Sequence, residues 1–268
     1  MTCDLHLGDC LDPATGLPSL PDLSVDHCIM DPPYSAHVHQ AQRRGHIEHE
    51  PGTGRASFNQ STSLGFEPLT PDLAQAVADE CARLVSRWVL VFCDLEGVDL
   101  WRTCLRGALG GGSDKPSIEP VRVGIWVKEG STPQFTGDRP AVGAEAIVIA
   151  HRLGKKRWNG GGRHGVWTHP IMLDHSHKGA RVHPTQKPLG LMEALVRDFT
   201  DPGDLILDPF AGSATTGVAC KRLGRSFVGW EKDATFYERA RVRLESTQEQ
   251  CVLDLAAPQG TESTKETI

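Results

Sequence analysis

The sequence lacks the features that would place the chain in a membrane or a secretory pathway. No stretch approaches the ~20 consecutive apolar residues that a membrane-spanning helix needs. The N-terminal segment MTCDLHLGDC has no basic region followed by an apolar run, so we expect no secretory signal. The eight cysteines include no C-x-x-C pair, a pattern typical of reduced thiols in a cytosol and not of disulfides or a zinc ribbon.

The histidines do not form a metal-binding motif either. Six of them stand in three close pairs, in segments that have the composition of loops. None of the pairs makes H-E-x-x-H, so we expect no metal site. The pairs are His37 and His39, His46 and His49, and His175 and His177.

Acidic residues are scarce in one part of the chain. The whole chain carries a formal net charge of −6, so it is not a generally basic protein. Between residues 151 and 187, however, eight basic residues stand against one acid, Asp174. Such a segment is typical of a polyanion site, because phosphate contacts dominate nucleic-acid affinity. A solvated loop whose lysines maintain solubility is the alternative.

Strand and helix signals alternate along the chain. The 268 residues, 39% of them apolar, suffice for one large domain with a buried core. The alternation predicts an α/β fold with a mostly parallel twisted sheet and helices on both faces. We expect strands at residues 24–30, 88–93, 121–127, 145–150, 204–207 and 226–230. We expect helices from Pro71, after Pro188 and after Thr215, and a last helix over residues 234–244.

Three segments do not fit this core, although no boundary divides the chain into two domains. We expect a single domain over residues 1–247, with a mobile loop at 35–70 and a recognition insert at 154–182. Residues 248–268 form a small polar tail that we expect to be disordered. In the insert, Trp158 and Trp167 either stack on DNA or form a small core.

The first motif that carries chemistry is Asp31-Pro32-Pro33-Tyr34, directly after an expected strand. The ends of strands are where open α/β sheets place ligands. Proline has no N–H, so carbonyl groups here are available to accept hydrogen bonds from a substrate amine. The Asp31 carboxylate is a further acceptor, and Tyr34 offers a ring on which a base can stack. A proline-rich tight turn is the alternative.

The second motif, DPFAGSATTG, begins at Asp208 and joins a strand to a helix. Small residues let a ligand approach the backbone, and the helix N-terminus supplies N–H donors. Glu231 follows Gly212 by 19 residues and ends the next strand, where an acid holds ribose hydroxyls in nucleotide-binding folds. The motif lacks G-x-G-x-x-G and G-x-x-x-x-G-K-[ST], so neither a dinucleotide nor a nucleoside triphosphate is favoured. A tight turn without a ligand is the alternative.

The order of these motifs resembles one family. D-P-P-Y, a basic glycine-rich insert, H-P-T-Q-K-P at residues 183–188, D-P-F-A-G-S-A-T-T-G and G-W-E occur in the order of the permuted (β-class) amino-methyltransferases of DNA. The resemblance covers residues 5–244. It implies a Rossmann-like methyltransferase fold, a circularly permuted motif order and S-adenosylmethionine as cofactor.

The resemblance also implies roles for individual residues. Asp31, Pro32, Pro33 and Tyr34 would form the catalytic pocket. The cofactor-binding residues would be Asp9, Thr185, Gln186, Lys187, Asp208, Phe210, Gly212, Ser213, Thr215 and Glu231. Among them, Glu231 would hold the ribose, and residues 185–187 would lie against the carboxylate of the cofactor. The sequence departs from the family at Ala214, where a third glycine is usual, and its methyl group would narrow the cofactor site.

The implied partner is double-stranded DNA, and the implied location is the cytoplasm of a prokaryotic or phage-infected cell. The candidate DNA-binding residues are Arg43, Arg44, Lys155, Lys156, Arg157, Arg163, Lys178 and Arg181. A homodimer and a cognate restriction endonuclease, which is not required for activity, are both compatible with the family.

The sequence has no Pro-Cys dipeptide, which excludes the thiolate route to a methylated cytosine carbon. The chemistry that fits is direct transfer to an exocyclic amine of a base flipped out of the duplex. D-P-P-Y favours N6 of adenine in this family, and N4 of cytosine is the alternative. A third alternative is a catalytically inactive DNA-binding protein with the same fold.

Overall fold

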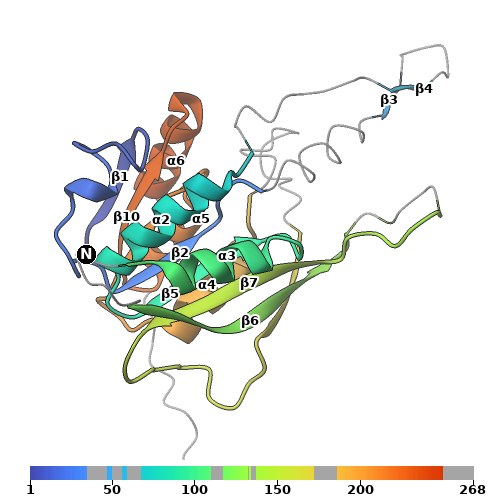
Figure 1. Ribbon diagram of the computed structural model, residues 1–268. Helices are drawn as coiled ribbons and strands as arrows, with labels where there is room; N and C mark the ends of the chain where they lie inside the picture. Colours follow the sequence, from blue (N-terminus) through green and yellow to red (C-terminus); the bar gives the residue numbers. More distant parts are fainter. Residues whose placement is uncertain are drawn as a thin grey trace, which may run out of the picture.

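The computed structural model describes residues 1–34, 68–109, 117–131, 133, 137–171 and 186–249, and the backbone of two short strands, β3 (Ile47–His49) and β4 (Ala56–Phe58). Within these residues, helices cover both faces of an eight-stranded sheet (Figure 1), as the sequence predicts for an α/β fold. The strands are β1 (Cys3–Leu7), β2 (His27–Met30), β5 (Trp88–Cys93), β6 (Ile118–Glu129), β7 (Ala144–Arg152), β8 (Val166–Pro170), β9 (Leu205–Asp208) and β10 (Ser226–Glu231). The helices are α2 (Pro71–Leu84), α3 (Val98–Gly107), α4 (Leu189–Phe199), α5 (Thr215–Arg222) and α6 (Ala234–Ser246), with a short 3-10 turn, η1 (Leu17–Ser19).

The sheet is mostly parallel, and its winding reverses near the middle. The strand order is β1-β10-β9-β2-β5-β7-β6-β8, and in this sheet only β7 runs antiparallel to its neighbours. The chain passes from β2 outward to β5, and from β9 outward to β10 on the other side. Ligands of open α/β sheets bind at the carboxyl ends of strands where the order reverses in this way. Both sequence motifs lie at this reversal, because one follows β2 and the other follows β9.

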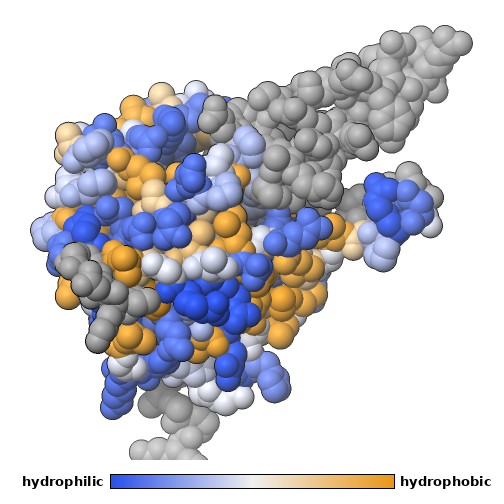
Figure 2. Space-filling model, viewed as in Figure 1, coloured by the Kyte–Doolittle hydropathy of each residue, from blue (hydrophilic) through white to orange (hydrophobic). Residues whose placement is uncertain are grey.

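Alternation along the central strands divides the core into two layers. In β5, Val89 and Val91 belong to the layer that α2 and α3 cover, whereas Leu90 and Phe92 belong to the layer that α4 and α5 cover. All six residues of this strand are buried, as expected for a strand covered on both faces. The face over α2 and α3 shows hydrophilic and hydrophobic residues interspersed (Figure 2).

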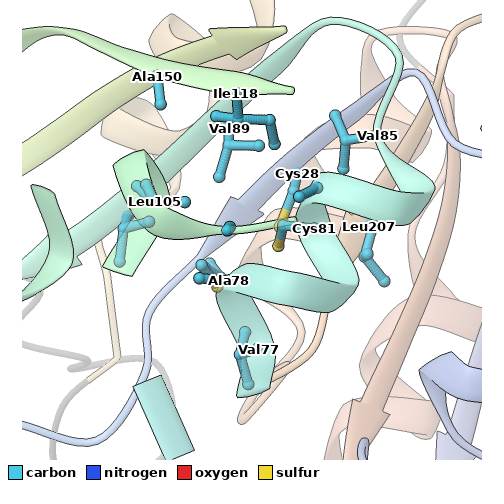
Figure 3. Packing of buried hydrophobic residues seen from close by; sticks show 14 of the residues in the cluster. Cys28, Val77, Ala78, Cys81, Val85, Val89, Leu105, Ile118, Ala150 and Leu207 are labelled. Atoms are coloured by element: carbon cyan, nitrogen blue, oxygen red, sulfur yellow. The ribbon is translucent and has the colours of Figure 1, made fainter. Parts of the chain in front are cut away.

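Helix α2 begins and packs as its sequence predicts. The side chain of Thr70 caps the helix by accepting a hydrogen bond from the backbone N–H of Leu73, and Pro71 occupies the first turn. Its inner face points to the sheet, where Cys81 lies against Cys28 of β2 with 3.9 Å between the sulfur atoms (Figure 3). This packing fixes one side of β2 and therefore the position of the motif that follows it.

In the eight-stranded sheet and the α-helices around it, three elements were not expected from the sequence: β1, α3 and β8. The short elements η1, β3 and β4 were not expected either. Strand β1 lies at an edge of the sheet and is mostly exposed, so it has no apolar run. Strand β8 lies inside the expected recognition insert, but it pairs with β6 in the main sheet. Gly124 of β6 makes room for Trp167, because a Cβ atom there would come within 2.6 Å of the indole ring.

The two tryptophans of the basic segment belong to hydrophobic packing. Trp167 is buried, and Trp158 packs edge-on against Phe199 of α4 with ring centroids 4.8 Å apart. Of the two roles considered for these residues, the structure supports the core. No helix in the described ranges is long and apolar enough to cross a membrane.

Candidate active site

The first part of the site is the turn after β2. Asp31 continues a strand whose four residues are all buried, and Pro32 to Tyr34 carry the chain out of the sheet. Oδ2 of Asp31 accepts a hydrogen bond from the ammonium group of Lys187 at 2.7 Å. Its other oxygen, Oδ1, is buried and has no hydrogen-bond partner among the described residues. A buried acceptor without a partner is unfavourable by about 1–3 kcal/mol, so this atom is suited to an incoming donor.

Lys187 joins Asp31 to two other groups. Its ammonium group donates to the hydroxyl of Tyr34 at 3.0 Å and lies 3.3 Å from Oε2 of Glu145. The Tyr34 hydroxyl in turn donates to Oε2 of Glu145 at 2.7 Å. Lys187 is buried two residues before α4, so this residue of H-P-T-Q-K-P lies beside Asp31 and Tyr34 of D-P-P-Y.

Glu145 is a site residue that the sequence analysis missed. It lies in β7, in phase with Ile147 and Ile149, whose side chains join the layer under α4 and α5. Lys128 of β6 binds its second oxygen, Oε1, at 2.6 Å. A charged residue in the buried phase of the apolar run AEAIVIAH is the signal that could have revealed it.

The pKa values in this cluster follow from burial and from the charges nearby. Burial raises the pKa of Asp31, Lys187 opposes this shift, and the negative charge of Glu145 adds to it. Burial alone would raise the pKa of Glu145, but Lys187 and Lys128 outweigh it, and the pKa is lowered. Burial also raises the pKa of Tyr34, so its hydroxyl stays protonated. The pKa of Lys187 is raised, because its two carboxylate partners outweigh burial, so it stays an ammonium ion.

The second part of the site is the turn after β9. Asp208 is 2% exposed, and its oxygens accept from the hydroxyl of Thr216 at 2.6 Å and the backbone N–H of Phe210 at 3.1 Å. Burial raises the pKa of Asp208 to about 7, and the charges of Asp31 and Glu231 contribute. Asp208 therefore stabilises the turn by hydrogen bonds to residues on both sides of it.

Two residues of this turn adopt left-handed backbone conformations. Gly212 has φ +54°, and among the described residues beyond its chain neighbours a Cβ atom there would lie within 4 Å of only the carbonyl oxygen of Phe210, at 3.9 Å. Ala214 has φ +53°, a conformation that glycine adopts more easily than alanine. Its methyl group is completely buried in the layer under α4 and α5. The left-handed conformation gives a physical reason for the glycine that the family usually has at this position.

Glu231 ends β10 beside the same turn. Its Oε2 accepts from the backbone N–H of Gly212 at 2.9 Å, and its Oε1 accepts from that of Asp233 at 2.7 Å. Burial raises the pKa of Glu231, and the two backbone donors oppose this shift. Each carboxylate oxygen can accept more than one hydrogen bond, so the acid remains able to bind hydroxyl groups.

The remaining residues of this turn are held by an arginine that the sequence analysis missed. Arg243 of α6 donates to the carbonyl of Ser213 and to the hydroxyl of Thr215, both at 2.9 Å. The amide oxygen of Gln186, when turned toward Arg243, lies 3.2 Å from both terminal guanidinium nitrogens. Asp9 follows β1 beside the end of β10: the N–H of Gly8 donates to the carbonyl of Glu231 at 2.9 Å, and the Asp9 carboxylate pairs with Lys232 at 3.0 Å. Thr185 is outside the described residues.

The predicted DNA-binding residues have different surroundings. Arg157 pairs with Asp201 at 3.1 Å, and Arg163 pairs with Asp198. Lys155 and Lys156 are exposed. The other four predicted residues lie outside the described residues, namely Arg43, Arg44, Lys178 and Arg181.

No group of three or more metal-binding side chains occurs in the part of the chain that the structure describes. The six paired histidines contribute nothing to this result, because their side chains lie outside it. The expectation that the protein has no metal site stays a prediction.

The site therefore combines the glycine-containing turn after β9, the Glu231 carboxylate at the end of β10 and a buried Asp31 oxygen without a partner among the described residues. The model of the N6/N4 DNA methylase family matches residues 25–242, which is most of the chain. The chain belongs to this family.

Individual relatives add detail about similarity. Over 84 residues the chain is 48% identical to the type II methyltransferase M2.DpnII of Streptococcus pneumoniae, and the match covers 31% of each protein. The chain thus spans less than a third of the length of this curated relative. The structure of the M1.HpyAVI–SAM complex has a TM-score of 0.62 at 24% identity and covers 91% of this chain and 99% of its own. The cytosine-N4-specific PvuII DNA methyltransferase has a TM-score of 0.65 at 16% identity, over 91% and 86%. These two likenesses show the fold.

Proposed function

We propose that the protein is a β-class DNA amino-methyltransferase that transfers a methyl group from S-adenosylmethionine to N6 of adenine in double-stranded DNA. The observation that carries this proposal is the buried Oδ1 of Asp31, which has no hydrogen-bond partner in the described part of the chain and lies where the sheet reverses. Family membership supports the reaction class, and the D-P-P-Y sequence supports adenine over cytosine. We further infer that the enzyme works in the cytoplasm.

Asp31 and Pro32 would act on the target amine. The lone pair of an exocyclic amine is delocalised into the base, so the amine is a weak nucleophile. Oδ1 of Asp31 and the carbonyl group of Pro32 would accept its two N–H groups and localise that lone pair. As the nitrogen–carbon bond formed, the sulfur–methyl bond of the sulfonium would break and leave a neutral thioether; the nitrogen would become positive and would lose a proton, which Oδ1 could accept. The raised pKa of Asp31 favours this transfer.

Tyr34 would hold the flipped base by stacking. Its hydroxyl is fixed between Lys187 and Glu145, so the ring has a defined orientation before any substrate arrives. A base inside a duplex cannot reach Asp31, so the target must leave the stack. Preorganisation of the ring reduces the entropy lost when the base binds.

The turn after β9 fits the proposed cofactor. Glu231 would accept the ribose hydroxyl groups, and the open space above Gly212 would let the methionine end approach the backbone. When bound, S-adenosylmethionine supplies an electrophilic methyl group. Phe210, Ser213 and Thr215 belong to the same turn, and Asp9 would lie toward the adenine.

The decisive experiment uses purified protein, radiolabelled S-adenosylmethionine and mixed-sequence duplex DNA. Digestion to nucleosides and mass spectrometry should show N6-methyladenine. N4-methylcytosine would retain the mechanism and overturn the choice of base. Cofactor binding without transfer at any sequence would favour the inactive DNA-binding alternative.

Asp31→Ala is the matched control for this assay. We expect it to abolish transfer while cofactor affinity stays within several-fold, because Asp31 lies on the β2 side of the site and Glu231 on the β10 side. Transfer by this variant would rule out the proposed role of Asp31.

A further inference from the structure

Four charged side chains from four segments form one chain of ion pairs beside Tyr34. Asp31 binds Lys187 at 2.7 Å, Lys187 lies 3.3 Å from Glu145, and Glu145 binds Lys128 at 2.6 Å. Asp31 follows β2, Lys187 precedes α4, and the other two lie on the paired strands β7 and β6. Negative and positive charges alternate along this row of four side chains, so the cluster is close to neutral overall.

We propose that Lys187 and Glu145 are positioning residues for methyl transfer: Glu145 holds the ammonium group of Lys187 against Oδ2 of Asp31, which leaves Oδ1 as the atom that meets the target amine. This inference rests on the proposed function, and it extends it to two residues outside D-P-P-Y. It assigns Lys187 to the catalytic carboxylate and not to the carboxylate of the cofactor.

The position of Lys187 is determined from several sides. Its ammonium group lies 5.1 Å from the ring centroid of Phe92, 5.2 Å from that of Tyr34 and 6.0 Å from that of Trp126. Two carboxylates, the Tyr34 hydroxyl and the surrounding aromatic rings leave this cation little freedom. A fixed cation in turn fixes the carboxylate that it binds.

Glu145 is placed to act through Lys187. Its Oε2 accepts a hydrogen bond from the Tyr34 hydroxyl and forms an ion pair with Lys187, while its Oε1 forms an ion pair with Lys128. If Glu145 were absent, Lys187 would keep Asp31 as its one anionic partner among the described residues. The spacing of the two carboxylates around one ammonium group therefore determines how strongly Asp31 is neutralised.

Lys187 and Glu145 have opposite effects on the pKa of Asp31. Lys187 stabilises the Asp31 carboxylate, whereas Glu145 on β7 destabilises it. The other titratable groups that influence this site are Tyr34, Asp208 after β9 and Cys93 at the end of β5. Removing Lys187 should raise the pKa of Asp31, and removing the charge of Glu145 should lower it.

The test compares Lys187→Met and Glu145→Gln with the wild-type protein. We expect the acid limb of the pH profile of the single-turnover methylation rate to move up by about one pH unit in Lys187→Met and down in Glu145→Gln. Asp198→Asn is the matched control, because it removes a buried carboxylate that binds Arg163 and Trp167 at the other end of α4. Its acid limb should not move.

A second readout does not depend on activity. Carbon-13 NMR of labelled aspartate carboxyl groups follows the Asp31 titration directly, with its resonance assigned by its loss in Asp31→Asn. Opposite shifts in the two variants would support the proposal. Shifts in the same direction, or none, would overturn it and leave a purely structural ion cluster.

The two readouts separate this inference from the proposed function. If the wild-type protein does not methylate DNA but the Asp31 resonance shifts as expected, the electrostatic assignment holds and the enzymatic function fails. If methylation occurs and neither variant shifts the profile or the resonance, the positioning role fails alone. Should Lys187→Met not fold, Glu145→Gln decides, because glutamine preserves the shape of the side chain.

Discussion

The carboxylate of Asp208 accepts a hydrogen bond from the hydroxyl of Thr216 at 2.6 Å, beneath the turn that joins β9 to α5. Asp208 pairs in register with Gly229 of β10, a position where a Cβ atom would come within 3.0 Å of the Asp208 carbonyl oxygen. The acid thus lies in a closely packed part of the sheet, with few polar partners. Its burial explains why its pKa is raised to about 7.

The first prediction concerns the effect of Asp208 on stability. The folded state binds a proton at Asp208 more tightly than the unfolded chain, so stability falls as pH rises from about 4 to about 7. Asp208→Asn removes the buried charge and should unfold at a higher temperature than the wild-type protein at pH 8. The difference should shrink toward pH 5. A constant difference between pH 5 and pH 8 in thermal unfolding would contradict the raised pKa.

The second prediction concerns Asp204, a carboxylate with a lowered pKa that directly precedes β9. Asp204 binds the buried His27 at 3.0 Å and Arg87 at 2.7 Å, and despite its burial these partners lower its pKa to about 2. This carboxylate therefore stabilises the fold above pH 4, and the contribution is lost as pH falls toward 2. Asp204→Asn should lower the free energy of unfolding by about 2 kcal/mol at pH 7. Denaturant titrations at pH 7 and pH 3 should show a smaller loss at the lower pH.

The third prediction separates the effect of a methyl group at Gly212 on cofactor binding from its effect on protein stability. In Gly212→Ala the new methyl group meets one atom within 4 Å among the described residues beyond its chain neighbours, so the variant should lose only about 1 kcal/mol from its left-handed φ. The same methyl group would occupy the space proposed for the methionine end of the cofactor. We therefore expect at least a tenfold loss of S-adenosylmethionine affinity by calorimetry, with a small change in melting temperature.

Ala214→Gly is the matched control for this turn. It relieves the left-handed conformation of alanine but removes a methyl group that is fully buried under α4 and α5. These effects oppose each other, so stability should change by less than about 1 kcal/mol. Cofactor affinity should change little, because the methyl group lies in the core. A large gain in affinity would show that Ala214 narrows the site after all.

The fold was predictable where an apolar run or a helix-start residue marked an element. The run WVLVFC predicted both boundaries of β5, and Pro71 marked the first residue of α2, whereas α5 begins at Thr215 itself and not after it. β1 and β8 were not predicted, because strands at the edges of a sheet have few buried residues; Val166 of β8, for example, is exposed. Their assignment depends on pairing with β10 and β6, which no local pattern encodes.

The site was predictable only where its residues stood in a motif. Asp31, Asp208 and Glu231 could be predicted to lie together, because Asp208 and Glu231 end parallel strands and Asp31 directly follows one. Glu145 and Arg243 carry no motif, and they reach the site through strand pairing and helix packing over long distances in the sequence.

The last prediction concerns the basic segment before β8. Lys155 and Lys156 are exposed, whereas the neighbouring Arg157 already has Asp201 as a partner. Each lysine that binds a phosphate should contribute about 0.9 to the slope of log K against log salt concentration. Replacing both lysines by alanine should therefore weaken DNA binding and reduce the slope by about 2, measured by fluorescence anisotropy over a series of salt concentrations. Arg157→Ala should reduce the slope by less than either lysine, because the ion pair with Asp201 competes with phosphate. Arg241→Ala on α6, whose guanidinium group is paired with Glu238 and Glu245, is the control. An unchanged slope in the double lysine variant would place the DNA-binding surface elsewhere on the protein.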